Sequence, residues 1–166
     1  MIEARIHMPT PPSEARWHHL MALAEVLANV NAEWFVGRHL EADRMAMAGY
    51  ERPEVPCCIT CVEPPVRYAP PPPGAQQLCQ NWWPAPAVIA RGKATCLDAA
   101  AFDVGAARAK GKEAYVYLEP VGEPVNPNDP LSTLDFHAVA YIDGERIDSA
   151  AKLTKQNGCN GSACAA

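Results

Sequence analysis

The chain has 166 residues, of which 49% are hydrophobic, so it is long enough and apolar enough to form one compact domain with a core. A formal net charge of −5 gives no general basic surface for nucleic acid, and no apolar run approaches the roughly 18 residues of a membrane-spanning helix. The opening MIEARIHM lacks the layout of a signal peptide. We therefore expect a cytoplasmic or particle-associated (virion) protein without nucleic-acid or membrane partners.

Residues 1–50 predict a short strand followed by helices. Residues 1–8 alternate like a strand and end at a proline-rich stop, and a helical stretch begins at Ser13. Gly37 is a candidate interruption of the helix, with a second stretch ending near Gly49. One stripe of residues recurs at intervals of three and four along the helix: Trp17, Leu20, Met21, Ala24, Leu27, Asn31, Trp34 and Phe35.

Residues 51–78 are rich in proline and cysteine, and we interpret them as an extended arm of the same domain. The run Pro70 to Pro73 favours polyproline II. At the other end of the chain, residues 154–166 form a tail of small residues with low complexity.

Between the arm and the tail, residues 79–153 predict a compact α+β block. An alanine-rich helix should be closed by Gly111, and Asp143-Gly144 is typical of a type I′ hairpin turn. The expected elements are a helix over Thr95–Lys110, strands over Ala114–Leu118 and Phe136–Ile142, a loop over Glu119–Asp129 and a returning segment over Glu145–Asp148.

Cys96 stands where a reactive cysteine would be expected. Thr95 and Asp98 match the capping box of a helix N-terminus, which places Cys96 in the first turn. The positive end of the helix dipole favours the thiolate, and the free N–H groups of that turn can hold an oxyanion. The alternative is a small buried hydrophobic residue, the commoner role of cysteine.

His137 and Asp148 form a candidate base and orienting acid. If Asp143-Gly144 is a two-residue turn, Val139 pairs with Asp148 and His137 lies diagonal to Asp148 on the same sheet face. Side chains can close a diagonal separation of roughly 7–8 Å to a hydrogen bond. Such a carboxylate fixes the imidazole tautomer and stabilises the imidazolium. The alternative is an ordinary surface pair.

Two stretches resemble the transglutaminase-like cysteine peptidases of bacteria, which belong to the papain superfamily: NWWPAPAVIARGKATCLDAAAFDVGAARAKGKEAYV and FHAVAYIDGERIDSA. The resemblance covers roughly Asn81 to Ala151. It implies a papain-like α+β fold, in which the N-terminal helices and a Cys-bearing helix pack on a small antiparallel sheet. It also implies a triad of Cys96, His137 and Asp148 that needs no cofactor.

A further polar group should help to hold the oxyanion. Papain-like enzymes often use a glutamine upstream of the cysteine, which makes Gln80 a candidate. Asn31 on the helical stripe is a second, and the indole of Trp82 or Trp83 is a third. Each of these side chains could instead serve packing or capping.

The remaining cysteines leave several interpretations open. Cys57, Cys58 and Cys61 form a CC-x-x-C cluster, and Cys79 follows in the chain. Such a set is half of a structural zinc site, which Cys159, Cys164 or a histidine could complete. Ordinary thiols, or disulfides outside a cell, are the alternatives.

The sequence therefore predicts a thiol hydrolase of amide bonds acting on a peptide or a cell-wall peptide, with transamidation as the same chemistry on an amine acceptor. A first alternative is a structural component of a phage particle or another large assembly, inactive or weakly active. Neighbouring subunits would then hold the arm and the tail in place. A second alternative is an interaction module stapled by zinc.

Overall fold

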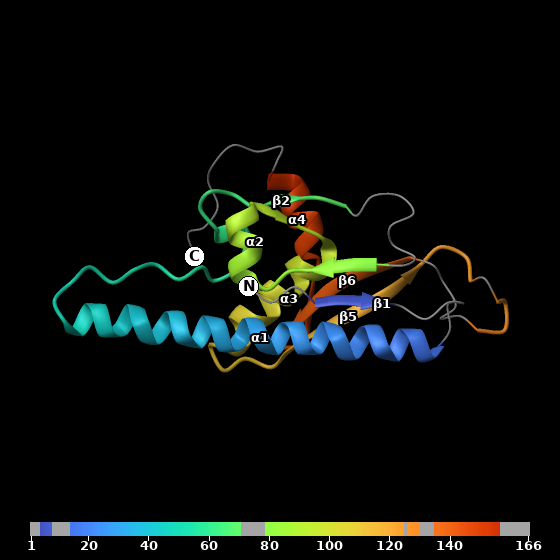
Figure 1. The fold of residues 1–166 in the computed structure, drawn as a ribbon, viewed down its shortest axis with the longest axis horizontal. Coiled ribbons are helices and arrows are strands. Elements are labelled where there is room, and N and C mark those ends of the chain that lie inside the picture. The colour runs from blue at the N-terminus through green and yellow to red at the C-terminus, as the bar shows by residue number, and fades with distance from the viewer. Residues whose placement is uncertain (1–3, 8–13, 71–78, 125, 130–134, 157–166) are drawn as a thin grey trace.

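The computed structural model describes residues 4–7, 14–70, 79–124, 126–129 and 135–156 (Figure 1). It is a mixed α+β structure, as predicted, with small sheets and helices arranged around one central helix. Residues 157–166, which include Cys159, Cys164 and most of the expected tail, lie outside the described part. No helix in the described part combines the length and apolar character needed to cross a membrane.

The central helix is α3 (Cys96–Arg108), whose residues are buried from Cys96 to Ala107. Alanine suits this position because it favours the helix and lets neighbouring backbones approach closely. The three-stranded antiparallel sheet of β5 (Ala114–Val121), β6 (Asp135–Ile142) and β7 (Glu145–Ile147) packs on α3, with β6 in the middle. Helix α1 (Glu14–Met47) also packs against α3 (Figure 1).

Helix α1 runs without interruption through Gly37, contrary to the expectation of two stretches. The glycine costs only about 1 kcal/mol relative to alanine. Phe35 and Ala42 are fully buried on either side of it, so packing holds the helix together. The helix ends at Met47, and Gly49 follows with a left-handed φ of 85°. The apolar stripe is confirmed at its main positions, with Trp17, Leu20, Ala24, Leu27, Asn31 and Phe35 all buried.

The described part of the arm packs against its own domain. Val55, Ile59, Val62 and Val66 are buried in a core cluster that α3 also enters. The arm forms the short 3₁₀ helix η1 (Ile59–Cys61) and strand β2 (Arg67–Tyr68), which pairs in parallel with β4 (Lys93–Ala94). The expectation that a neighbouring subunit holds this segment in place is therefore wrong for residues 55–68. Apolar side chains spaced between the prolines bury it within the chain.

The remaining elements are short. Strand β1 (Ala4–His7) pairs antiparallel with β3 (Cys79–Trp82), in line with the strand predicted at the N-terminus. Helices α2 (Ala85–Arg91) and α4 (Ser149–Gln156) were not expected from the sequence. Strand β5 continues past Leu118 into the segment that was expected to be a loop. Pro120 is compatible with this longer strand because β5 lies at the edge of the sheet, where a residue without an N–H group is tolerated.

We expect Gly105→Ala to destabilise the fold. A Cβ at position 105 would lie 2.5 Å from the Asn31 Cβ and 2.9 Å from the Ala32 nitrogen, so α1 and α3 would have to move apart. We expect a loss of about 1–3 kcal/mol in the free energy of unfolding, measured by chemical denaturation.

Gly37→Ala is the matched control, because nothing lies within 4 Å of its added Cβ. It should raise the free energy of unfolding by about 0.5–1 kcal/mol. Equal stability of the two variants would contradict the close approach of the helices at Gly105.

Candidate active site

Cys96 occupies the first turn of α3, as predicted. Thr95 is the N-cap: its Oγ1 accepts from the Asp98 N–H at 3.3 Å, and Asp98 Oδ2 accepts from the Thr95 N–H at 3.0 Å. This reciprocal capping box fixes where the helix begins and so where the Cys96 side chain emerges. The residue is 8% exposed, so the thiol lies at the rim of the core rather than on the open surface.

Asp98 joins the start of α3 to the segment before α2. Its Oδ1 accepts from the Trp83 N–H at 2.8 Å, and its Oδ2 also accepts from the Thr95 hydroxyl at 2.9 Å. Burial raises the pKa of Asp98, while these hydrogen bonds and the positive charge of Arg91 act in the opposite direction. A buried carboxylate with several donors holds those donors firmly, because losing one leaves a buried acceptor unpaired.

The hairpin places His137 beside Asp148. Asp143 and Gly144 have φ of 51° and 82°, as a type I′ turn requires, and Ile142 pairs with Glu145. His137 Nε2 lies 2.9 Å from Asp148 Oδ2. The predicted contact between the two side chains is therefore confirmed.

Asp148 is held at both carboxylate oxygens. It follows β7 directly and caps the unexpected helix α4, because its Oδ1 accepts from the Ala151 N–H at 2.9 Å. Burial raises the pKa of Asp148, but the bonds from Ala151 and His137 and the charge of Arg146 outweigh it and bring the pKa below its ordinary value. The carboxylate therefore stays ionised and keeps its orientation at neutral pH.

His137 links Asp148 to Cys96. Hydrogen bonding with the Cys96 side chain raises the pKa of His137, burial lowers this pKa, and Asp148 raises it further. The resulting pKa of His137 is about 9. Because Nε2 faces Asp148, the other ring nitrogen, Nδ1, is the one available to Cys96. The side chains of His137 and Asp148 are 28% and 27% exposed, so solvent reaches the pair.

Tyr68 lies near the start of α3, a position that no sequence pattern predicted. In β2 it pairs with Ala94, two residues before Cys96. Burial raises the pKa of its phenol, and the negative charges of Cys96 and Asp148 raise it further. An aromatic residue in a proline-rich arm gives no local signal, because its position depends on the parallel β2–β4 pairing.

Asn31 is not at the site, contrary to the expectation. Its Oδ1 accepts from the Ala85 N–H at 2.7 Å, so it holds the start of α2. It lies against Gly105, nine residues beyond Cys96 along α3 and so roughly 13 Å away. Its polar side chain lies on the buried stripe because it serves this capping contact.

The other oxyanion candidates, Trp82, Trp83 and Gln80, lie in different surroundings. Trp82 is 5% exposed and shares a core cluster with Cys96. Trp83 lies under the guanidinium of Arg91, 3.8 Å from the ring centroid, which gives its indole a packing role. The side chain of Gln80 lies outside the described residues, so that proposal remains a prediction.

Cys57, Cys58 and Cys61 come together on and beside η1. All their sulfurs lie within 4.8 Å of one another, and among the described residues this is the group of three that could hold a metal ion. The sulfur-to-sulfur distances are 3.9 Å for Cys57–Cys58, 3.1 Å for Cys57–Cys61 and 2.8 Å for Cys58–Cys61. The side chain of Cys79 lies outside the described residues, so its part in the cluster stays a prediction.

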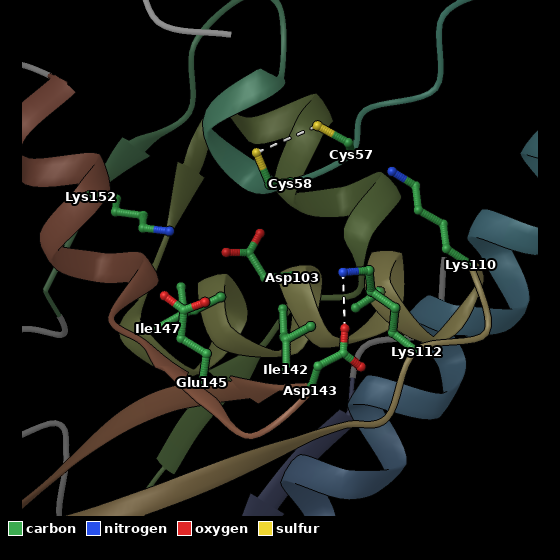
Figure 2. A pocket seen from close by; sticks show the side chains of 11 residues that line it. Cys57, Cys58, Asp103, Lys110, Lys112, Ile142, Asp143, Glu145, Ile147 and Lys152 are labelled. Atoms are coloured by element: carbon green, nitrogen blue, oxygen red, sulfur yellow. Dashed lines mark hydrogen bonds and ion pairs between the residues drawn. The ribbon is translucent and has the colours of Figure 1, made fainter. Parts of the chain in front are cut away.

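A cavity of about 300 Å³ opens beside this cluster (Figure 2). Its wall carries Cys57, Cys58 and Asp103 together with the three lysines Lys110, Lys112 and Lys152. Neither Cys96 nor His137 nor Asp148 lines it. The cavity beside the cysteine cluster is thus separate from these three residues.

Comparison of the chain with protein-family models, curated proteins and solved structures found no match. A functional conclusion therefore rests on the geometry of the site.

We expect the His137 imidazole to titrate near pH 9 in the folded protein, as followed by NMR. Cys96→Ala should lower this pKa, because it removes the hydrogen bond that raises the pKa most. Cys57→Ala should leave it unchanged. Titration of the wild-type ring near 6.5 would contradict the contacts with Cys96 and Asp148.

The same pKa predicts how stability varies with pH. The folded pKa of about 9 lies above the unfolded value of 6.5, so the stabilisation from this proton is complete below pH 6.5 and is lost as pH rises through about 9. The difference in melting temperature between wild type and His137→Gln should shrink over that window. A difference independent of pH would show that His137 does not bind its proton more tightly in the folded state.

Proposed function

We propose that this protein is a thiol hydrolase of amide bonds, with Cys96 as nucleophile, His137 as base and Asp148 as the carboxylate that orients the base. One observation carries the proposal: His137 Nε2 lies 2.9 Å from Asp148 Oδ2, and the interaction of the same ring with the Cys96 side chain is the main cause of its raised pKa. A nucleophile, a base and an orienting group in this order form the working unit of covalent amide hydrolysis.

The side chains have complementary tasks in the proposed reaction. The proton of the Cys96–His137 pair lies on the ring before the attack, in keeping with the pKa of about 9 for His137, and the Cys96 sulfur then attacks the carbonyl carbon. Collapse of the tetrahedral intermediate breaks the C–N bond, and His137 returns the proton to the leaving amine. A water molecule, activated by His137, then hydrolyses the thioester and restores the thiol. An amine in place of water would give transamidation.

The start of α3 supplies groups for the oxyanion. Helix geometry leaves the N–H groups of Cys96 and Leu97 without partners inside the helix, whereas the Asp98 N–H is bonded to Thr95. Two such donors beside the nucleophile are suited to a developing negative charge. Trp82 belongs to the same core cluster as Cys96 and Tyr68 packs against that cluster, which makes both side chains candidates to assist these donors.

We further propose that the architecture is of the papain and transglutaminase-like type. In support, the helix that carries Cys96 packs on an antiparallel sheet whose middle strand carries His137. The resemblance of the two stretches around these residues also supports it. On this basis the substrate class is a peptide or a cell-wall peptide. The chemistry uses only protein side chains, so zinc at the cysteine cluster would act outside the triad.

A structural role in a larger assembly is the second candidate. Exposed apolar side chains along α1 support it, because such residues are suited to packing against another subunit. They are Val26, Val30, Val36, Leu40 and Met47. In that role the triad would be idle.

Thiol reactivity separates the two functions. We expect iodoacetamide to alkylate Cys96 faster than the more exposed Cys57 at neutral pH, because a cation at His137 favours the thiolate as the attacking form. Mass spectrometry of the labelled peptides measures both rates. His137→Gln should slow labelling at Cys96 alone, and equal rates in wild type would favour the idle structural role.

Activity on peptide amides should depend on the whole triad. We expect no turnover in Cys96→Ala and a loss of about 10⁴-fold in kcat for Asp148→Asn, because the imidazole tautomer is no longer fixed. Asparagine can still accept from the Ala151 N–H, so the cap of α4 is retained. Asp43→Asn, at an exposed ion pair with Arg52, is the control and should leave kcat unchanged. Turnover in Cys96→Ala would exclude Cys96 as the nucleophile.

A further inference from the structure

The cysteine cluster is built by one short turn of backbone. Cys58 precedes η1 in an extended conformation, and the Cys61 N–H donates to the Cys58 carbonyl at 3.1 Å. In a 3₁₀ turn, side chains three residues apart lie one above the other, which brings the sulfurs of Cys58 and Cys61 together. Cys57, the residue before, adds its sulfur from the exposed side. Three thiols thus converge where a disulfide would need two.

The spacing of the sulfurs suits a thiophilic metal. Zinc binds thiolate sulfur at about 2.3 Å in tetrahedral geometry, which places pairs of sulfurs roughly 3.8 Å apart. The Cys57–Cys58 distance of 3.9 Å agrees with this value. The other two distances, 3.1 and 2.8 Å, need to open by less than about 1 Å, which side-chain rotation provides. A divalent ion with three thiolates carries one net negative charge, which Lys110 and Lys152 in the wall of the same cavity can offset, whereas Lys112 is paired with Asp143 (Figure 2).

Hydrogen bonds tie this turn to both ends of α4. Asp103 Oδ1 accepts from the Ile59 N–H at 2.6 Å, and its Oδ2 accepts from the Ser149 hydroxyl at 2.6 Å. At the other end of the helix, Gln156 Nε2 donates to the Thr60 carbonyl at 2.9 Å. Asp103 is buried, with 4% of its surface exposed, so water replaces neither of its partners without cost.

We propose that Cys57, Cys58 and Cys61 bind a zinc-class metal ion, and that the bound ion holds η1 and through it α4. Because α4 begins directly after Asp148, the ion would also steady the carboxylate that orients His137. This last consequence rests on the proposed function, whereas metal binding and the ordering of α4 do not. The fourth coordination position is left to water.

Metal binding is tested on the full chain, reduced and freed of metal, by titration with Zn²⁺ against a chromophoric chelator and by the absorption spectrum with Co²⁺. We expect one ion per chain and a Co²⁺ spectrum with sulfur-to-metal charge transfer in tetrahedral geometry. Cys58→Ser and Cys61→Ser should each weaken binding by at least about tenfold, since even the partners of metal ligands contribute that much. Cys96→Ser is the matched control and should bind as wild type does.

Absence of stoichiometric binding in the reduced protein would overturn the metal site, and so would unchanged binding in both serine variants. A disulfide within the cluster that forms in place of metal uptake would overturn it as well. Circular dichroism of the serine variants establishes that they are folded. None of these measurements uses catalytic activity, so failure of the metal site and failure of the hydrolase proposal are separate results.

The link to α4 is tested by amide hydrogen exchange with Zn²⁺ or with chelator. Zinc should slow exchange at Ala151 and Lys152, whose N–H groups donate to the Asp148 side chain and carbonyl. Ser149→Ala removes the hydroxyl bond to Asp103 and leaves the cysteines intact, so it should bind zinc equally but lose most of the protection. Exchange in α4 that zinc leaves unchanged in the wild-type protein would overturn the coupling.

Discussion

Every residue of α3 from Cys96 to Ala107 is buried, and two of them, Asp98 and Asp103, are carboxylates. A buried charge is costly unless hydrogen-bond donors surround it, so each carboxylate needs donors from other parts of the chain. Asp98 accepts hydrogen bonds from Trp83 and Thr95, and Asp103 accepts hydrogen bonds from Ile59 and Ser149. The segment before α2, the cysteine turn and α4 are thus fixed to the same helix that carries Cys96.

Small residues complete this arrangement. Ala138 and Ala140 of β6 and Ala100 and Ala101 of α3 are essentially fully buried in one cluster, so the sheet can approach the helix closely. His137 precedes Ala138 on the same strand, so this packing also fixes where the His137 backbone lies relative to α3. Close packing of alanines on both elements sets the distance between β6, which carries His137, and α3, which carries Cys96.

The parts of the site that could be predicted from the sequence depend on local chemistry. The capping box spans Thr95 and Asp98, and the turn at Asp143-Gly144 sets the register that brings His137 to Asp148. Predictions from the sequence were wrong where contacts between distant segments determine the structure. Gly37 continues a helix because of packing on either side of it, and Asn31 caps α2 from another helix. The part played by Tyr68 depends on a parallel pairing between segments that have no shared pattern.

The two bonds to Asp148 have a consequence for the entropy of the proposed reaction. One carboxylate oxygen holds the start of a helix and the other holds an imidazole, so the side chain has no free torsion when the substrate arrives. Freezing a side-chain rotor costs up to about 2 kcal/mol. Here the side-chain entropy is lost when the protein folds, and each turnover begins with the carboxylate already in place. A helix of eight residues, too short to be anticipated, thus acts as the clamp that keeps an acid oriented.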